Sequence, residues 1–190
     1  MLMLDLCAGL CGASQAMINL GWQVITLDID PAFKCAITTD VRHWHYYGQR
    51  PDLIWSSPPC KEFSIQHQII HPSTPDFSVL EACIRIIKES RPRFWIIENV
   101  RGSVKWFRPL LGDHRLRVGP YFLWGWFPDP GYIDTRDWRQ KQSISSSSPA
   151  QRAKIPYSLS WSIANSIMAQ LDFSNYPTFK RVNGGSYGLK

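Results

Sequence analysis

A cysteine follows two prolines in the segment WSSPPCKEFS, residues 55–64, at the end of a short apolar run. Because the proline ring fixes φ, Pro58 and Pro59 restrict the backbone that carries Cys60. Three explanations are open for a thiol held in this way: a stiff loop without a chemical role, a metal site, or a nucleophile positioned for attack. The other residues with reactive or ligand-binding side chains distinguish between these three explanations.

Acidic residues end the other apolar runs in the N-terminal half of the chain. They are Asp5, before the turn CAGLCGAS (7–14); Asp28 and Asp30, at the end of WQVITLDID (22–30); Asp40, in AITTDV (36–41); and Glu98, followed by Asn99, in RFWIIENV (93–100). In open α/β sheets, ligands bind at the carboxyl ends of the parallel strands. We therefore expect these acids and Cys60 to lie along one edge of a sheet.

The glycine turn after Asp5 suits a bound ligand, because Gly9 and Gly12 have no side chain to block an approach to the backbone. Its spacing is neither the dinucleotide fingerprint G-x-G-x-x-G nor a phosphate-binding P-loop. An acid at the end of the second strand, here Asp28, suits a ribose diol. Together with Asp40, these features indicate a cofactor that carries a nucleoside.

The elements that must position these residues alternate between strands and helices. Apolar runs predict strands over 1–6, 22–30, 36–41, 52–57, 93–100 and 119–128, and helical spacing is found over 14–21 and, most clearly, 76–91. This alternation predicts an α/β fold, with a doubly wound, mostly parallel sheet and helices on both faces.

Composition sets the outer bounds. At 190 residues, 44% of them hydrophobic, the chain is expected to form a single domain over 1–190. The net charge of +6 makes an anionic partner plausible. Five cysteines, an odd number, and an N-terminal apolar run interrupted by Asp5 predict reduced thiols in the cytoplasm, without a membrane span.

The motifs DLCAGLCGAS, LDID, TTDV, SSPPCKEFS and IIENVRG stand in an order and at a spacing that resemble the cytosine-5 DNA methyltransferases. The resemblance covers residues 2 to about 102 and returns weakly over 152–167, within a predicted closing helix at 152–170. It implies a Rossmann-like methyltransferase fold that uses S-adenosylmethionine.

By this resemblance, Cys60 is the nucleophile that adds to carbon 6 of cytosine. Glu98 would be protonated and hydrogen-bond ring nitrogen 3, and Asn99 would brace the Pro-Cys loop. The stretch HRLR (114–117) resembles, imperfectly, the Gln-x-Arg-x-Arg pattern whose arginine contacts cytosine oxygen 2. Arg115 and Arg117 are therefore candidates, with Arg117 taken as the third catalytic residue, and a solvated basic loop is the alternative.

The resemblance also implies a cofactor pocket formed by Asp5, Cys7, Ala8, Gly9, Leu10, Asp28, Ile29, Asp40, Val41 and Pro58. Asp28 would hold the ribose hydroxyls, Asp40 would approach the adenine amine, and Ile29 would pack on the ring. This chain has Cys7 where the family usually has phenylalanine, and Cys11 where it usually has glycine. Another residue would have to compensate for the missing aromatic ring, or affinity for the cofactor would be modest.

Residues 103–150 form a short variable segment in place of a target recognition domain. Its aromatic residues, Trp106, Trp124, Trp126, Tyr132 and Trp138, are interleaved with Lys105, Arg108, Arg136, Arg139 and Lys141. Such a pattern suits single-stranded or flipped-out nucleic acid, and it also suits an ordinary core with a basic rim. We favour nucleic acid, because the motifs of the resemblance already require a cytosine. The predicted partner is cytosine-containing DNA bound with weak sequence preference, as for an enzyme of a phage or mobile element.

Other functions stay open at this level. The same chemistry could act on RNA or a free cytidine nucleotide, or the chain could be a binding module with little turnover. A zinc site from Cys7, Cys11, His67 and His71 is disfavoured, because the two pairs are far apart in sequence. A hydrolase using Cys60 and His67 would leave the acidic strand ends unexplained, and we predict no bound metal.

Overall fold

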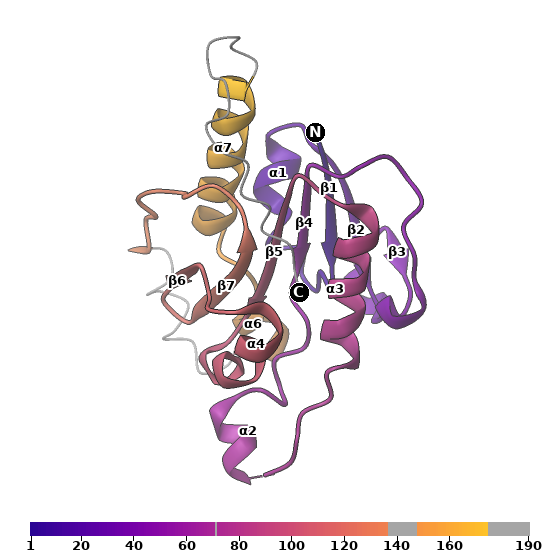
Figure 1. The fold of residues 1–190 in the computed structure, drawn as a ribbon, viewed down its shortest axis with the longest axis vertical. Helices are drawn as coiled ribbons and strands as arrows, with labels where there is room; N and C mark the ends of the chain where they lie inside the picture. The colour runs from indigo at the N-terminus through magenta and orange to yellow at the C-terminus, as the bar shows by residue number, and fades with distance from the viewer. Residues whose placement is uncertain (71, 137–147, 175–190) are drawn as a thin grey trace.

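A computed structural model of the chain describes residues 1–70, 72–136 and 148–174, and contains a seven-stranded sheet with helices on both faces (Figure 1). The strands are β1 (Leu2–Leu6), β2 (Gln23–Asp28), β3 (Ile37–Thr38), β4 (Leu53–Ser56), β5 (Phe94–Asn99), β6 (Leu116–Val118) and β7 (Tyr121–Trp126). The helices are α1 (Gln15–Asn19), α2 (Ile65–Ile70), α3 (Ser78–Ser90), α4 (Val104–Leu111), α6 (Pro149–Ala153) and α7 (Tyr157–Ser174), and three 3-10 turns are η1 (Pro31–Phe33), η2 (Val41–His43) and η3 (Arg101–Ser103).

The strand order is β3-β2-β1-β4-β5-β7-β6. The first five strands in this order are parallel, whereas β7 runs antiparallel to both β5 and β6. The predicted α/β fold with a mostly parallel sheet and helices on both faces is confirmed. The chain winds outward from β1 to β3 and then returns to β4 on the other side of β1, so the point where the winding reverses lies between β1 and β4.

Alternate residues of the strands enter two separate cores. Met3, Trp55 and Ile96 face α1 and α7, and all three are fully buried. Leu4, Ile54 and Ile97 point to the opposite face, which α3 and α4 cover. Because side chains alternate across a strand, the parity of a residue number decides which face of the sheet a functional side chain joins.

Helix α3 confirms the clearest amphipathic pattern in the sequence. Leu80, Cys83 and Ile86 lie on its buried side. The helix ends at Arg91, which adopts a left-handed conformation with φ of 47°, and Pro92 follows. Cys83 is therefore a core residue.

The segment predicted as one closing helix over 152–170 is two helices. The α-helical turn α6 ends before Lys154, whose backbone is extended, and α7 begins after Pro156. Proline disfavours helical geometry in the residue before it, so the chain bends at this point. Trp138, Arg139 and Lys141 lie outside the described residues.

Two α-helices and one strand, α2, α4 and β6, were not predicted from the sequence. Helix α4 contains Pro109, which normally argues against a helix, and α2 has no buried residue. Together with α6, both helices lie at the end of the sheet where the parallel strands finish (Figure 1). None of the described helices is long and apolar enough to cross a membrane.

Candidate active site

A cavity of about 230 Å³ lies at the carboxyl ends of β1, β4 and β5. Eight of the residues predicted to form the site line it: Asp5, Cys7, Ala8, Gly9, Leu10, Pro58, Cys60 and Glu98. The predicted nucleophile and the predicted acid therefore meet the glycine turn in one place. This is the edge at which an open α/β sheet binds ligands.

The loop that carries Cys60 is held from two sides. The side-chain amide of Asn99 donates a hydrogen bond of 2.9 Å to the carbonyl of Pro58, which is the predicted bracing contact. At the other end of the loop, Gly102 of η3 lies so close that a Cβ placed there would be 2.0 Å from the carbonyl oxygen of Phe63. The position of the thiol is thus set by β5 and η3 as well as by the two prolines.

Glu98 is buried on the α1 and α7 face, because it has the same parity in β5 as Ile96. Burial raises the pKa of its carboxyl to about 7, and a hydrogen bond from Ser57 opposes part of that rise. A substantial fraction of Glu98 is therefore protonated near neutral pH, when it can donate a hydrogen bond.

The Cys60 thiol is mostly enclosed, and burial raises its pKa. The nearby Glu98 carboxylate raises that pKa further, because it repels a thiolate. The two groups are thus linked electrostatically: protonation of Glu98 removes a charge that disfavours the reactive form of Cys60.

Asp5 is the second buried acid of the cavity. Burial raises its pKa to about 7, the hydroxyl of Ser14 donates a hydrogen bond that opposes the rise, and the charge on Asp28 adds to it. Its other oxygen, Oδ1, is buried and finds no hydrogen-bond partner within the described part of the chain. A carboxylate in this setting is suited to a cationic or hydrogen-bonding ligand.

The glycine turn after β1 depends on its two glycines for different reasons. Gly9 has a φ of 51°, and its amide donates a hydrogen bond of 2.9 Å to Asp28. Gly12 packs on the connection between α6 and α7, where a Cβ would lie 2.6 Å from the carbonyl oxygen of Ile155. The turn can adopt a left-handed conformation at the first glycine and approach the closing segment at the second.

The remaining predicted cofactor residues lie around the cavity and do not line it. Asp28 is buried and supports the turn through Gly9. Ile29 is 61% exposed, Asp40 caps η2 and pairs with Arg42, and Val41 is buried in the α3 core. The Arg42 guanidinium lowers the pKa of Asp40 to about 2.

Several residues of the cavity were missed by sequence reasoning. They are Ala13, Phe33, Ser57, Val100, Pro120, Tyr121, Ala150, Ala153, Lys154 and Ile155. Gly12 and Pro59 also line the cavity, and they belong to the glycine turn and the Pro-Cys loop that the sequence singles out. Phe33 contributes an aromatic ring to the cavity. The family usually has a phenylalanine at the position of Cys7, so Phe33 can compensate for the ring that is missing there. The Cys7 thiol instead meets Cys83, and the hydrogen bond between the two sulfurs, together with burial, raises the pKa of Cys7. No signal in the sequence identifies Phe33, whereas the weak resemblance over 152–167 does point to Lys154 and Ile155.

Arg117 is not brought into this cavity. It lies opposite Phe122, which lies opposite Asn99, so its side chain belongs to the face of the sheet that Glu98 does not share. Its guanidinium is 5.2 Å from the centre of the Phe122 ring and lines a separate hollow. Contact between Arg117 and the target base stays a prediction.

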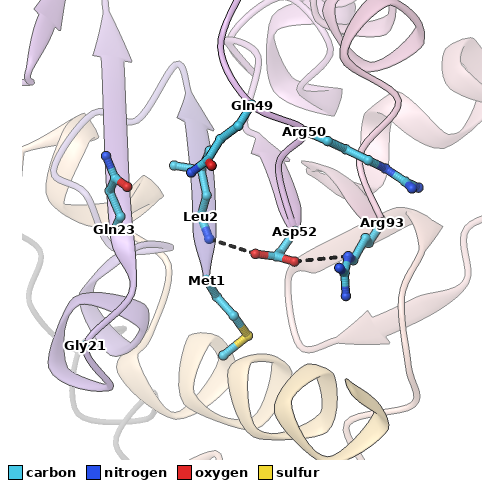
Figure 2. A pocket seen from close by; sticks show the side chains of 8 residues that line it. All are labelled: Met1, Leu2, Gly21, Gln23, Gln49, Arg50, Asp52 and Arg93. Atoms are coloured by element: carbon cyan, nitrogen blue, oxygen red, sulfur yellow. Dashed lines mark hydrogen bonds and ion pairs between the residues drawn. The ribbon is translucent and has the colours of Figure 1, made fainter. Parts of the chain in front are cut away.

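A further hollow, at the amino ends of the strands, offers a contrast (Figure 2). Asp52 accepts a hydrogen bond from the amide of Leu2 and pairs with Arg93 at 3.2 Å. The Arg50 guanidinium donates to the carbonyls of Arg91 and Pro92. Arg50, Asp52 and Arg93 are thus paired with one another or with backbone groups, which fits a structural role.

The alternative cysteine sites gain no geometric support. In the ranges 1–70, 72–136 and 148–174, no three histidine, cysteine or acidic side chains converge as metal ligands do, and His71 lies outside these ranges. His67 is on α2 and does not line the cavity of Cys60.

Comparison with known proteins assigns the chain to a family through one family model. The family model of C-5 cytosine-specific DNA methylases matches residues 1–106. The chain is 29% identical over 55 residues to the Type II methyltransferase M.AquIA of Picosynechococcus sp., a match that covers 29% of this chain and 22% of that enzyme. A structure described as that of a DNA modification methyltransferase encoded within an E. coli prophage matches with a TM-score of 0.47 and 20% identity, over 66% of this chain and 46% of that one. The matches thus span less than half the length of either relative. Because the family match extends over more than half of the 190 residues, the chain belongs to the C-5 cytosine-specific DNA methylase family.

Proposed function

We propose that the protein transfers a methyl group from S-adenosylmethionine to carbon 5 of cytosine in DNA, through a covalent adduct with Cys60. The observation that carries this proposal is the single cavity in which Cys60 and Glu98 meet Asp5 and the glycine turn. A nucleophile and an acid on their own would also suit a hydrolase. The adjoining turn, with its two buried acids, supplies the binding site that a methyl donor requires.

At the cytosine end, the Cys60 thiolate adds to carbon 6 and makes carbon 5 nucleophilic. Carbon 5 then takes the methyl group, loses its proton, and the thiolate leaves to restore the ring. Glu98, protonated, donates a hydrogen bond to ring nitrogen 3 and stabilises the charge that develops when the sulfur adds. The raised pKa of Glu98 supports this role, because an ordinary glutamate would be ionised at neutral pH.

The same protonation helps the nucleophile. Burial and the Glu98 charge both raise the pKa of Cys60. When Glu98 is neutral the second contribution disappears, so thiolate formation becomes easier in the protonation state that can bind nitrogen 3. One carboxyl group therefore sets both the hydrogen bond to the base and the reactivity of the sulfur.

The residues around the glycine turn fit the proposed cofactor. When bound, S-adenosylmethionine supplies a methyl group on a positively charged sulfur. Asp5 has a buried oxygen without a partner among the described residues, which suits the cationic part of such a ligand. Asp28 already accepts amide hydrogen bonds from Gly9 and Asp30, and its remaining lone pairs can accept from ribose hydroxyls. Phe33 provides the apolar ring surface for adenine.

Transfer of a radiolabelled methyl group to DNA, RNA and free deoxycytidine nucleotides, measured in parallel, tests the proposal. Label is expected in DNA with the wild-type chain and not with Cys60→Ser, while calorimetry shows the same cofactor affinity for both. Label found in RNA or nucleotides alone would assign the chemistry to another substrate. Cofactor binding without transfer to any of the three would identify a binding module.

A further inference from the structure

A second hollow, of about 920 Å³, lies between α2, α4 and the β6–β7 hairpin. We infer that it binds a nucleotide next to the target cytosine in the same DNA strand, with the base on its aromatic wall and the phosphate against its cations. This inference rests on the proposed function, and we call the site the flanking hollow.

The flanking hollow carries only positive charge. Arg101, Lys105, Arg108 and Arg117 line it, and no aspartate or glutamate is present among the described residues that do so. Arg108 is paired with Asp113 at 2.6 Å. The other three form no ion pair with a carboxylate in the described ranges of the chain, in contrast to Arg93 at the amino edge of the sheet. Three uncompensated cations around one hollow predict an anionic ligand.

The walls also carry aromatic rings. Trp106 and Phe122 line the hollow together with Phe63, and each of the first two has a cation over its ring: Lys105 at 4.6 Å from the Trp106 centroid and Arg117 at 5.2 Å from that of Phe122. Aromatic surface beside cations is the arrangement that holds single-stranded nucleic acid, through base stacking and phosphate contacts. A simple inorganic anion would contact the cations but would not stack on the aromatic rings.

Two buried nitrogens in the flanking hollow lack partners. Trp106 Nε1 and His114 Nδ1 are shielded from water, and neither finds a hydrogen bond from any residue that the structure describes. A nucleotide has acceptors for an indole N–H and both donors and acceptors for an imidazole. Buried polar atoms are nearly always satisfied, so a polar ligand that reaches these two nitrogens would supply the bonds that they lack.

The position of the flanking hollow relative to Cys60 fits a neighbouring nucleotide. In the Cys60 loop, residues 58–60 line the active-site cavity and Phe63 lines the flanking hollow. In the adjoining loop, Val100 lines the active-site cavity and Arg101 lines the flanking hollow. Three residues of chain span at most about 11 Å. A stacked strand advances about 3.4 Å per nucleotide, so the hollow lies within about three nucleotides of the target. On this inference Arg117 contacts a flanking phosphate, which is an alternative to the predicted contact with oxygen 2 of the target base.

Fluorescence anisotropy tests the inference on the full chain. It measures the binding of a fluorescein-labelled single-stranded oligodeoxynucleotide with one cytosine, across a range of salt concentrations. Arg101→Gln, Lys105→Gln and Arg117→Gln change exposed side chains and leave the cores intact. Lys88→Gln, an exposed cation on α3, is the matched control. Removal of one cation that binds a phosphate is expected to lower the slope of log K against log salt by about 0.7, and the control is expected to keep the wild-type slope.

The stacking contact has its own readout. Oligonucleotides with an abasic unit at each position near the cytosine are compared with the intact strand. At one flanking position, the abasic unit is expected to weaken binding to the wild-type chain by roughly 5- to 150-fold, which corresponds to the loss of one stacked base. The same abasic unit is expected to have a much smaller effect on binding to Trp106→Leu. Thermal melting of that variant shows whether it is folded, and the glutamine variants report on the hollow in either case.

The outcomes separate this inference from the proposed function, because binding does not require methyl transfer. The inference would be overturned if the glutamine variants bound with the affinity and salt slope of Lys88→Gln and no flanking position were sensitive to an abasic unit. This holds even if the wild-type chain methylates DNA. Weakened binding in those variants, with a sensitive flanking position, would support the hollow even if no methyl group were transferred.

Discussion

Glu98 and Asp5 enter the same cavity from β5 and β1, and burial raises the pKa of each to about 7. Both side chains leave water for a mostly enclosed site, where the neutral acid is favoured over the carboxylate. In the unfolded chain each would ionise near pH 4. The folded state therefore loses stability as the pH rises from about 4 through 7, while both acids give up their protons in a place that disfavours the charge.

This linkage predicts the effect of Glu98→Gln on stability. The amide cannot ionise, so the variant is expected to gain about 3 kcal/mol in free energy of unfolding relative to the wild-type chain at pH 8, and little at pH 4. Urea denaturation at the two pH values measures the difference. Glu81→Gln, at an exposed position of α3, controls for the substitution itself. An equal gain at both pH values would mean that the change acts through packing and not through the charge.

At the scale of elements, the cofactor side of the cavity is closed by contact between two distant segments. The glycine turn follows β1, and the connection from α6 to α7 packs directly on it at Gly12. Tyr121 of β7 reinforces this contact, because its hydroxyl donates a hydrogen bond of 3.2 Å to the carbonyl of Lys154. The closing segment is therefore part of the proposed binding site as well as a cover for the α1 face.

Gly12→Ala is expected to weaken binding of S-adenosylmethionine by about 5- to 150-fold. The added methyl group would lie 2.6 Å from the Ile155 oxygen, and overpacking of this kind costs about 1–3 kcal/mol. Gly21→Ala is the matched control, because Gly21 has a φ of 78° but no neighbour within 4 Å of an added Cβ. It is expected to lose stability and keep cofactor affinity, as measured by calorimetry. Unchanged affinity in Gly12→Ala would show that the closing segment does not shape the site.

At the scale of the whole molecule, the active-site cavity and the flanking hollow lie at the same end of the sheet, with the Cys60 loop between them. Residues 103–150 contribute α4, β6 and β7, and residues 137–147 lie outside the described part of the chain. The sequence predicts that this segment stands in place of a domain that reads base edges in the major groove. Most contacts with DNA are then expected to reach phosphates, which carry no sequence information.

Single-stranded or mismatched DNA is therefore expected to be methylated at least as well as perfect duplex. Extruding a cytosine from a stacked pair costs a few kcal/mol, and this cost is smallest where the base is already unpaired. Bisulfite sequencing of single-stranded, mismatched and duplex DNA treated with the purified protein gives the comparison. Methylation confined to one fixed duplex motif of four or more base pairs would show that the protein reads sequence by itself.

The sequence predicts the parallel half of the sheet well, because β1, β2, β4 and β5 are continuous apolar runs that end in acids or at the Pro-Cys loop. The same strand ends bring Asp5, Cys60 and Glu98 together, so the centre of the site follows from strand order alone. Local sequence patterns predict secondary structure less well where tertiary packing determines it. Helix α4 forms despite Pro109 because Phe107 is fully buried between the rings of Phe63 and Trp124.

The periphery of the site could not be predicted for a similar reason. Phe33 lies on a 3-10 turn whose direction depends on Asp30, the capping residue, and on Lys34 in a left-handed conformation. Ile29 and Asp40 were placed in the pocket by resemblance, yet Ile29, directly after β2, is mostly exposed, and Asp40, after β3, pairs with Arg42. Side-chain direction in such turns depends on contacts that a linear pattern does not contain.

The central claim is a covalent bond between Cys60 and carbon 6 of cytosine. A DNA oligonucleotide containing 5-fluorocytosine tests it most directly, because fluorine cannot leave as the proton does and the adduct is trapped after methyl transfer. Incubation with S-adenosylmethionine, followed by intact-mass and peptide mass spectrometry, is expected to show one oligonucleotide attached to Cys60 and none in Cys60→Ser. Methylation of ordinary cytosine without any trapped adduct, or attachment at one of the other four cysteines, Cys7, Cys11, Cys35 or Cys83, would contradict the account.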